Sequence, residues 1–306
     1  MPTMQRQYFI IDAFATERFT GNPAAVVLDT NDLEEPAMQA IAAEFNLSET
    51  AFVLPPQTGE GDVRFRWFTP TTEVSMCGHA TIAGVHALVQ SGRVSRAGNE
   101  SASLRIDTLS GTLTAFVESI PGQEVGQVIW LELPTPQLVD YPVAGVELST
   151  LLGLSPDQFE ADLPIVKTQD NDLIVFAGSF AAVNDARPDF GKLKAWQSKR
   201  GLRGLCLASS KTLTPSIHVQ SRFFAPAAGV NEDPVTGSVH GPLAAYLAEH
   251  GLVPIDDNGL AGMQCVQAKA GGRAGVVYAL AQRQHDDTYA VRIGGQAVTV
   301  MKGALV

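Results

Sequence analysis

The stretch Cys77-Gly78-His79-Ala80-Thr81 recurs later in the chain, in altered letters, as Thr236-Gly237-Ser238-Val239-His240. Each copy follows an aromatic-x-Pro tripeptide (68–70 and 224–226) and a polar loop, and each leads into an apolar run that ends at a second glycine. The two glycines of a copy stand 14 positions apart in both cases, 78 to 92 and 237 to 251. This pattern predicts a strand, a loop, a tight turn and a helix, in that order and in duplicate.

Both predicted helices begin where a ligand could approach. A helix N-terminus has unpaired backbone N–H groups and a partial positive charge, so it holds anions. Two such ends in a duplicated chain predict two half-sites for one small anionic metabolite. For either copy alone, an ordinary glycine turn before a helix is the competing interpretation, and the matched spacing of the two copies weighs against it.

The helices that follow the two motifs are apolar on nearly every side. Residues 80–89 have only Thr81 and His86 as polar positions, and residues 241–248 are almost all apolar, with Pro242 expected in the first turn. A helix that is apolar all round has to be buried all round, so strands must surround it. Short runs rich in β-branched and aromatic residues supply those strands. The predicted fold class is therefore α+β, with two pseudo-symmetric domains, each a β-barrel-like sheet wrapped around a central helix.

The chain has 306 residues, which suits two domains of roughly 150 residues each. The segment Glu118 to Val128 contains Pro121, Gly122 and Gly126 and is the expected linker. We therefore expect an N-terminal half over 1–120 and a C-terminal half over 128–294, with the last strand (about 296–306) returning to the first half. Two further amphipathic or polar helices are expected over 34–45 and 187–200.

Composition excludes several classes of protein. The formal net charge is −11, which disfavours nucleic acid and anionic membranes as partners. No apolar run approaches the ~20 residues of a membrane span, and the N-terminus does not resemble a signal peptide. The three cysteines, Cys77, Cys206 and Cys265, form no CxxC pair, which disfavours a disulfide framework or a structural zinc site. The sequence is typical of a cytoplasmic protein.

Glu49 is the first candidate for chemistry. It stands between the helix over 34–45 and the apolar strand Thr50 to Leu54. Partial desolvation at such a place would raise the pKa of the carboxyl group toward the range useful for general acid–base work. The alternative is a solvated carboxylate in a turn.

Cys77 and His79 flank the glycine of the first motif. A thiol at a helix N-terminus can become a thiolate base, although Cys77 can equally be a small buried hydrophobic residue. His79 can act as an acid, a base or a donor to a carboxylate, or it can be ordinary polar surface.

The second motif offers Asp233, Thr236, Gly237 and Ser238. Asp233 could orient a substrate amine or a histidine, and Ser238 can donate a hydrogen bond; an ordinary capping turn is the alternative. The sequence contains no HExxH, Walker loop or strand-anchored GxGxxG, so no metal and no nucleotide cofactor is expected.

Taken together, several motifs resemble the PhzF family of phenazine-biosynthesis-like proteins. They occur in the family's order and span nearly the whole chain: Ile11-Asp12-Ala13-Phe14, Phe19-Thr20-Gly21-Asn22-Pro23, Asn46-Leu47-Ser48-Glu49-Thr50, the Cys77-Gly78-His79 motif, Glu232 to Ser238, Gly272-Arg273 and Gly294-Gly295. The resemblance implies the diaminopimelate-epimerase-like fold, with a site between two similar halves. It also implies a cofactor-free isomerase that acts as a homodimer.

The resemblance implies roles for individual residues. Glu49 matches the acid–base that removes and redelivers a proton, with His79 and Asp233 assisting that transfer. Cys77, Gly78, Thr236, Gly237 and Ser238 are the positions expected to bind the substrate. The related epimerases use two cysteine bases, one at each helix start, whereas here Asp233 stands near the second start and no cysteine is close to it in sequence.

Three functions remain open from the sequence. The first is proton transfer by Glu49 on one face of a small carboxylate-bearing metabolite. The second is an epimerase or racemase in which Cys77 is one base and Glu49 or Asp233 the other. The third is a metabolite-binding or interaction protein without turnover.

Overall fold

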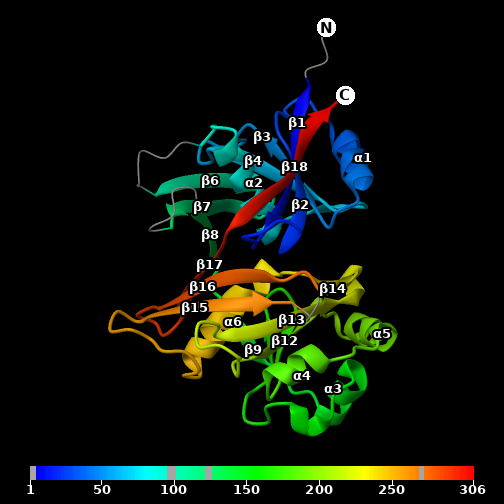
Figure 1. The fold of residues 1–306 in the computed structure, drawn as a ribbon, viewed down its shortest axis with the longest axis vertical. Coiled ribbons are helices and arrows are strands. Elements are labelled where there is room, and N and C mark those ends of the chain that lie inside the picture. Colours follow the sequence, from blue (N-terminus) through cyan, green and yellow to red (C-terminus); the bar gives the residue numbers. More distant parts are fainter. Residues whose placement is uncertain (1–4, 95–100, 121–125, 269–271) are drawn as a thin grey trace. The chain divides into compact units, whose positions relative to one another are not determined.

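The computed structural model describes residues 5–94, 101–120, 126–268 and 272–306. The chain divides into two compact units, one of residues 1–132 and 294–306 and the other of residues 133–293 (Figure 1). The chain therefore leaves the first unit once and returns to it with its last strand. The expected linker from Glu118 to Val128 is wrong: residues 121–125 lie outside the described residues, but Glu118 pairs with Val128 within the first unit, and the chain passes to the second unit only after residue 132.

Within the described residues, the first unit contains two helices and most of the N-terminal strands. Its elements are β1 (Arg6–Ala13), β2 (Asn22–Val27), α1 (Glu35–Phe45), β3 (Thr50–Leu54), β4 (Val63–Phe68), β5 (Glu73–Val74), α2 (Gly78–Gln90), β6 (Ala102–Thr108), β7 (Gly111–Ser119), β8 (Gln127–Leu133) and β18 (Ala297–Leu305).

The second unit contains the remaining helices. Its elements are β9 (Leu138–Asp140), α3 (Gly145–Leu152), η1 (Pro156–Gln158), β10 (Val166–Thr168), β11 (Asp172–Phe176), α4 (Phe180–Asp185), α5 (Phe190–Arg200), β12 (Gly204–Ser209), β13 (Val219–Ala225), η2 (Pro226–Ala228), β14 (Val230–Asp233), α6 (Gly237–Glu249), β15 (Leu260–Gln267), β16 (Gly275–Arg283) and β17 (Tyr289–Gly295).

The two units pair their strands in the same order. In the first unit the pairs β1–β2, β2–β3, β3–β4, β4–β6 and β6–β7 are antiparallel, parallel, antiparallel, parallel and antiparallel. In the second unit the pairs β10–β11, β11–β12, β12–β13, β13–β15 and β15–β16 repeat that alternation. A short strand joins the fourth strand of each series, β5 on β4 and β14 on β13. The repeated sequence pattern is therefore a repeated topology.

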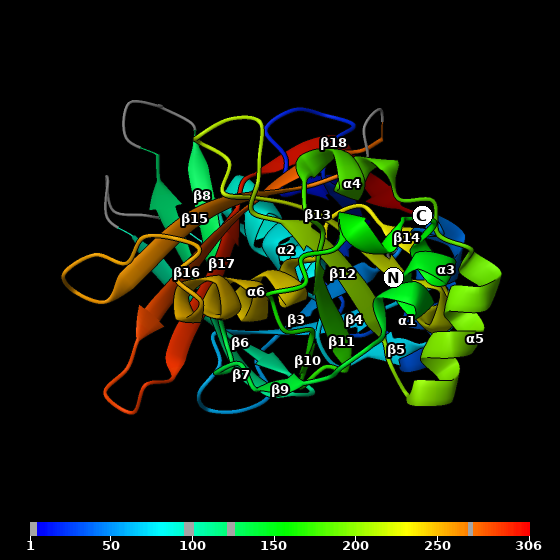
Figure 2. The ribbon, with the colours of Figure 1, turned by 90° about the horizontal axis from the view of Figure 1, so that it is seen from below.

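The two motif helices are the centre of each unit. In α2 ten residues are buried and in α6 eleven, out of 13 in each helix, so neither helix has a solvated face. Strands β1, β2, β3, β4 and β18 pack on α2, and β15 and β16 pack on α6 (Figures 1 and 2). This arrangement confirms the predicted α+β class with a sheet wrapped around a central helix. None of the helices in the described ranges is long and apolar enough to cross a bilayer.

One expectation about α6 is wrong. The sequence pattern places the start of this helix at Gly241 and Pro242 in its first turn, but α6 begins at Gly237, so Pro242 is its sixth residue. At that position proline removes the backbone hydrogen bond that the Ser238 carbonyl would accept. The helix tolerates this loss because it is held by burial on all sides rather than by its own propensity.

The repeat also includes a partly buried ion pair that the sequence motifs did not predict. Arg66 on β4 binds Glu73 on β5 through Nε and Nη2, at 2.6 and 2.7 Å. Arg222 on β13 binds Glu232 on β14 through the same two atoms, at 2.7 and 2.9 Å. Bidentate pairs of this kind fix geometry as well as adding energy. Each pair links the strand before the polar loop to the short strand after that loop. The motif helix begins a few residues after the short strand.

Each of these arginines also donates to a helix in the connection between two parallel strands of its unit. Arg66 donates to the Glu35 carboxylate on α1 at 2.8 Å. Arg222 donates to the carbonyls of Val183 and Ala186, at the end of α4, at 3.2 and 2.8 Å. Both guanidinium groups therefore also donate to a helix of their own unit, although the acceptors differ.

The last strand is attached to α2 through a histidine. His86 Nε2 lies 3.2 Å from Thr299 Oγ1, and Thr299 Oγ1 donates in turn to Gln90 Oε1 at 2.5 Å. Gln127 Nε2 lies 3.4 Å from His86 Nδ1. With the amides oriented in this way, a neutral His86 satisfies both partners, donating from Nε2 and accepting at Nδ1. Burial lowers the pKa of His86 from 6.5 to about 4, consistent with the neutral form.

We therefore expect the protein to lose stability in mild acid. A histidine whose folded pKa is depressed stabilises the fold fully above its unfolded value of 6.5 and loses that contribution as pH falls toward about 4. The loss from His86 should be roughly 2–3 kcal/mol of unfolding free energy across this range. Urea denaturation at a series of pH values measures it. A His86→Gln variant should show a shallower decline than the wild-type protein, and an equal decline in both would contradict the assignment.

Candidate functional site

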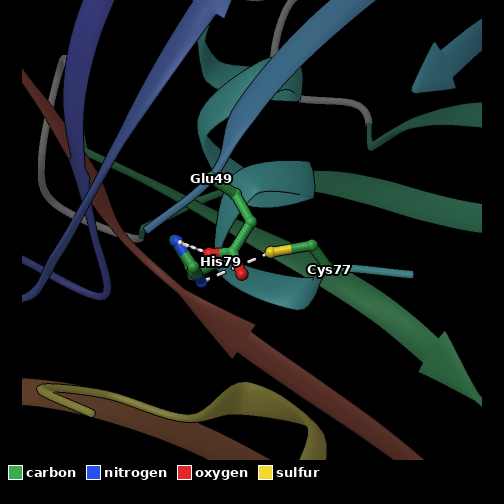
Figure 3. A group of neighbouring side chains, drawn as sticks. All are labelled: Glu49, Cys77 and His79. Carbon is green, nitrogen blue, oxygen red and sulfur yellow. Dashed lines mark hydrogen bonds and ion pairs between the residues drawn. The ribbon is translucent and has the colours of Figure 1, made fainter. Parts of the chain in front are cut away.

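Local structure places Glu49 at the start of β3. Helix α1 ends at Asn46, which adopts a left-handed conformation (φ 50°) and donates its N–H to the Ala42 carbonyl. This turn stops the helix and sends the chain through Glu49, whose carbonyl accepts a hydrogen bond from Ala25 N on β2. The backbone of Glu49 is thus held by sheet pairing, while its side chain is directed to the start of α2 (Figure 3).

Cys77 and His79 are positioned by the first turn of α2. Cys77 is the N-cap residue in an extended conformation, and its carbonyl accepts hydrogen bonds from Thr81 N at 3.0 Å and Thr81 Oγ1 at 2.6 Å. The equivalent carbonyl of the second unit, that of Thr236, lies 2.7 Å from His240 Nδ1. In both units a side chain four residues later anchors the N-cap carbonyl.

Glu49, Cys77 and His79 form one cluster (Figure 3). His79 Nε2 lies 3.2 Å from Glu49 Oε2, and His79 Nδ1 lies 3.5 Å from Cys77 Sγ. The imidazole therefore stands between a carboxylate and a thiol, with one ring nitrogen facing each. This order of groups allows a proton to pass among three side chains.

Burial keeps the imidazole of His79 neutral. His79 is 7% exposed, and desolvation lowers its pKa from 6.5 to about 4. At neutral pH the contact with Glu49 is therefore between a carboxyl group and a neutral ring. Nε2 has no hydrogen-bond partner among the described residues, because the nearby Glu49 oxygen lies outside hydrogen-bond geometry. A buried polar atom in this state indicates a place where another group binds.

The helix starts retain their backbone donors. In the described part of the chain, neither Cys77 nor Thr236 caps its helix with a side-chain hydrogen bond. The first-turn N–H groups of α2 and α6 therefore remain available to an anion.

In the second unit Asp233, Thr236 and Gln267 form a closed network. Thr236 Oγ1 donates to Asp233 Oδ2 at 2.5 Å, and Gln267 Oε1 accepts from Thr236 N at 2.9 Å. Gln267 Nε2 donates to the Asp233 carbonyl at 2.8 Å. Gln267 is 1% exposed, and sequence reasoning missed it because a glutamine on β15 gives no motif signal.

Ser238 lies beside a cation that the sequence motifs also missed. Arg203 Nη2 donates to Ser238 Oγ at 3.0 Å, while the same guanidinium binds both carboxylate oxygens of Asp172. Burial raises the pKa of Asp172, and Arg203 opposes that shift. Arg203 precedes β12 and approaches the start of α6 only through sheet pairing, so no spacing in the sequence relates the two. A guanidinium and N–H donors at one helix start suit a carboxylate ligand.

The predicted site residues thus form two groups, one in each unit. Glu49, Cys77, Gly78 and His79 lie together at the start of α2, and Asp233, Thr236, Gly237 and Ser238 lie together at the start of α6. The catalytic and binding roles assigned to them, and the expectation that both groups serve one site, remain predictions.

The other two cysteines are buried in strands of the second unit. Cys206 on β12 and Cys265 on β15 are fully buried, and burial raises the pKa of both thiols, that of Cys265 to about 12. Cys77 differs because it is 8% exposed and lies beside an imidazole at a helix N-terminus. Of the three thiols, Cys77 is therefore the most exposed.

The chain is similar to known proteins over nearly its whole length. The sequence model of the PhzC-PhzF family, described as phenazine biosynthesis-like protein, matches residues 11–303. A trans-2,3-dihydro-3-hydroxyanthranilate isomerase of Pseudomonas aeruginosa is 34% identical over 303 residues, covering 97% of this chain and 98% of the relative. A PhzF-family structure from Bacillus anthracis matches with a TM-score of 0.87 at 28% identity, over 99% of this chain and 100% of that one.

A more distant structure matches in fold alone. A probable proline racemase from Agrobacterium radiobacter matches with a TM-score of 0.66 at 10% identity, over 98% of this chain and 93% of that one. The wrapped-helix architecture therefore also occurs in a protein that is only 10% identical in sequence to this chain.

Alkylation of the native protein tests the environment of Cys77. Iodoacetamide should label Cys77 before Cys206 and Cys265, because a thiol must be accessible and able to lose its proton to react. Peptide mass spectrometry after short exposure should find one label per chain, and Cys77→Ala should remove it. Early labelling of either strand cysteine would contradict the contrast drawn between them.

Proposed function

The chain belongs to the PhzF family, and on that premise we propose that it is a cofactor-independent isomerase of a small carboxylate-bearing metabolite. Glu49 is the general acid–base of this reaction. Its carboxylate takes a proton from a substrate carbon, becomes a carboxylic acid, and returns the proton to another carbon on the same face. One carboxyl group can perform both steps because it is the acid after it has been the base.

The contact between Glu49 and His79 supports this proposal. A carboxyl oxygen and a neutral imidazole nitrogen stand 3.2 Å apart at a helix N-terminus. A neutral ring can accept or donate a proton without adding a buried charge, so it can assist Glu49 as the carboxyl group changes state. The adjacent N–H groups of α2 supply donors to the negative charge that develops on the substrate.

The proposed substrate class follows from the donors in the two units. In the first unit these are the first-turn N–H groups of α2, and in the second they are those of α6 together with Arg203. Both sets favour carboxylates. The relative from Pseudomonas aeruginosa is named for a carboxylate of this kind, dihydro-hydroxyanthranilate, which is the first compound to test. Homodimer formation and a cytoplasmic location remain predictions.

Replacing Glu49 by Gln removes the proton acceptor and keeps the shape of the side chain. We expect turnover to fall by at least about 10²–10⁴-fold, the usual contribution of a general acid–base group. The measurement is deuterium incorporation from D₂O into trans-2,3-dihydro-3-hydroxyanthranilate and a panel of small carboxylates. Glu44→Gln, an exposed glutamate on α1, is the matched control and should exchange at the wild-type rate.

Three outcomes separate the candidate functions. Retained exchange in Glu49→Gln, with folding unchanged by circular dichroism, contradicts the role of Glu49. Carboxylate binding by the wild-type protein with neither deuterium exchange nor an isomerised product favours a binding protein. Loss of exchange with retained binding in Glu49→Gln agrees with the proposal.

The position of Cys77 favours a second candidate, an epimerase with a thiol base. Its Sγ lies 3.5 Å from His79 Nδ1, so the imidazole could accept the thiol proton. If Glu49 acts alone, Cys77→Ala should reduce exchange by less than about 100-fold, below the usual contribution of a proton-transferring group. A loss of about 10³-fold or more, together with exchange at a stereogenic α-carbon in the wild-type protein, would instead support two-base chemistry.

A further inference from the structure

We propose that Glu49, Cys77 and His79 form a binding site for a thiophilic divalent cation, for which Zn²⁺ is the best match. One ligand atom from each of the three side chains lies within 4.8 Å of the other two. A cation bound to these atoms would occupy the groups assigned above to proton transfer. Inhibition of proton transfer by the bound cation therefore rests on the proposed function, whereas binding of the cation does not.

The separations in the cluster suit coordination. Zn²⁺ binds sulfur at about 2.3 Å and nitrogen or oxygen at about 2.0–2.2 Å, so neighbouring ligand atoms of a tetrahedral site lie about 3.3–3.8 Å apart. An imidazole binds a given ion through one nitrogen, so the contact of Cys77 Sγ with Nδ1 at 3.5 Å and that of Glu49 Oε2 with Nε2 at 3.2 Å cannot both persist around one ion. With one ligand atom from each side chain, the three atoms still lie within 4.8 Å of one another. Rotation of the side chains therefore has to close roughly 1 Å to reach the tetrahedral spacing.

The ligand types select the cation. A thiolate, an imidazole and a carboxylate are all ligands of Zn²⁺, and three protein ligands leave a fourth position open. Ca²⁺ and Mg²⁺ prefer sites made wholly of oxygen. A site with one sulfur and one nitrogen therefore favours zinc over the abundant hard cations.

The histidine offers an independent indication of a ligand. His79 is 7% exposed, and its Nε2 lacks a hydrogen-bond partner within the described ranges. Cys77 and His79 are fixed by the start of α2, and the Glu49 backbone is fixed by its bond from Ala25. The backbone positions of the three ligands are thus determined before an ion arrives, which reduces the ordering that binding requires.

The second unit lacks the same ligands. Thr236 and Ser238 occupy the positions of Cys77 and His79 in the repeat, so hydroxyl groups replace the thiol and the imidazole. Over the described residues, the Glu49 cluster is the one group of three such side chains close enough to share an ion. We therefore expect one cation per chain. Binding releases the Cys77 thiol proton to solvent as the sulfur–metal bond forms, and no group is oxidised or reduced.

Cobalt titration of the reduced, metal-free protein tests this site without any substrate. Co²⁺ should give a thiolate-to-metal charge-transfer absorption that saturates at one equivalent, and Zn²⁺ should displace it. Cys77→Ser should abolish the band. His79→Gln and Glu49→Gln should each weaken binding on the order of 10- to 100-fold or more, since even outer-shell partners of a metal contribute that much.

Two controls support the interpretation of the cobalt titration. Cys265→Ala removes a buried thiol outside the cluster and should bind Co²⁺ as the wild-type protein does. Zn²⁺ should also protect Cys77 of the wild-type protein from iodoacetamide, which tests the site even if a substituted chain misfolds. Absence of the cobalt–thiolate band, its persistence in Cys77→Ser, or unprotected Cys77 at saturating Zn²⁺ would overturn the proposal. Because no substrate is present, these results are independent of the Glu49→Gln exchange experiment.

Discussion

Burial of a helix with no polar face is the constraint on which the rest of the structure depends. Helices α2 and α6 have ten and eleven buried residues out of 13, so water cannot cover any side of them. Strands wrapped around each helix bury it on all sides, and both units use the same order of strand pairings to do so. The N-terminal turn of each helix, with its unpaired backbone N–H groups, is the polar end of an otherwise apolar helix. The unpaired backbone N–H groups at that end follow from the fold itself.

The duplicated units have kept their framework and diverged in chemistry. Both retain the bidentate pair between a strand arginine and a glutamate of the short following strand, Arg66 with Glu73 and Arg222 with Glu232. Both anchor the N-cap carbonyl with a side chain four residues later. The first helix start then carries a thiol and an imidazole, and the second carries hydroxyl groups with Arg203 nearby. The expectation of an isomerase of the PhzF family is confirmed at the level of the family.

Sequence reasoning worked where a short pattern determines local structure. It identified the two motif helices and the helix that becomes α1, because apolar spacing and turn residues are local signals. It failed for α3 and α4, whose few turns are stabilised by packing in the core of the second unit rather than by their own pattern. It also misplaced the start of α6, because Pro242 was read as a first-turn residue and not as an interior residue held by its surroundings.

The sequence by itself determined that the chain is a duplication, that each copy buries a helix, and which family it resembles, because these depend on composition and spacing. Only the tertiary structure decided which side chains meet. Glu49 reaches His79 from the residue before β3, and Arg203 reaches Ser238 from the residue before β12. Such contacts depend on strand register and on the direction of each side chain. The separation of two residues along the chain determines neither the strand register nor the direction of a side chain.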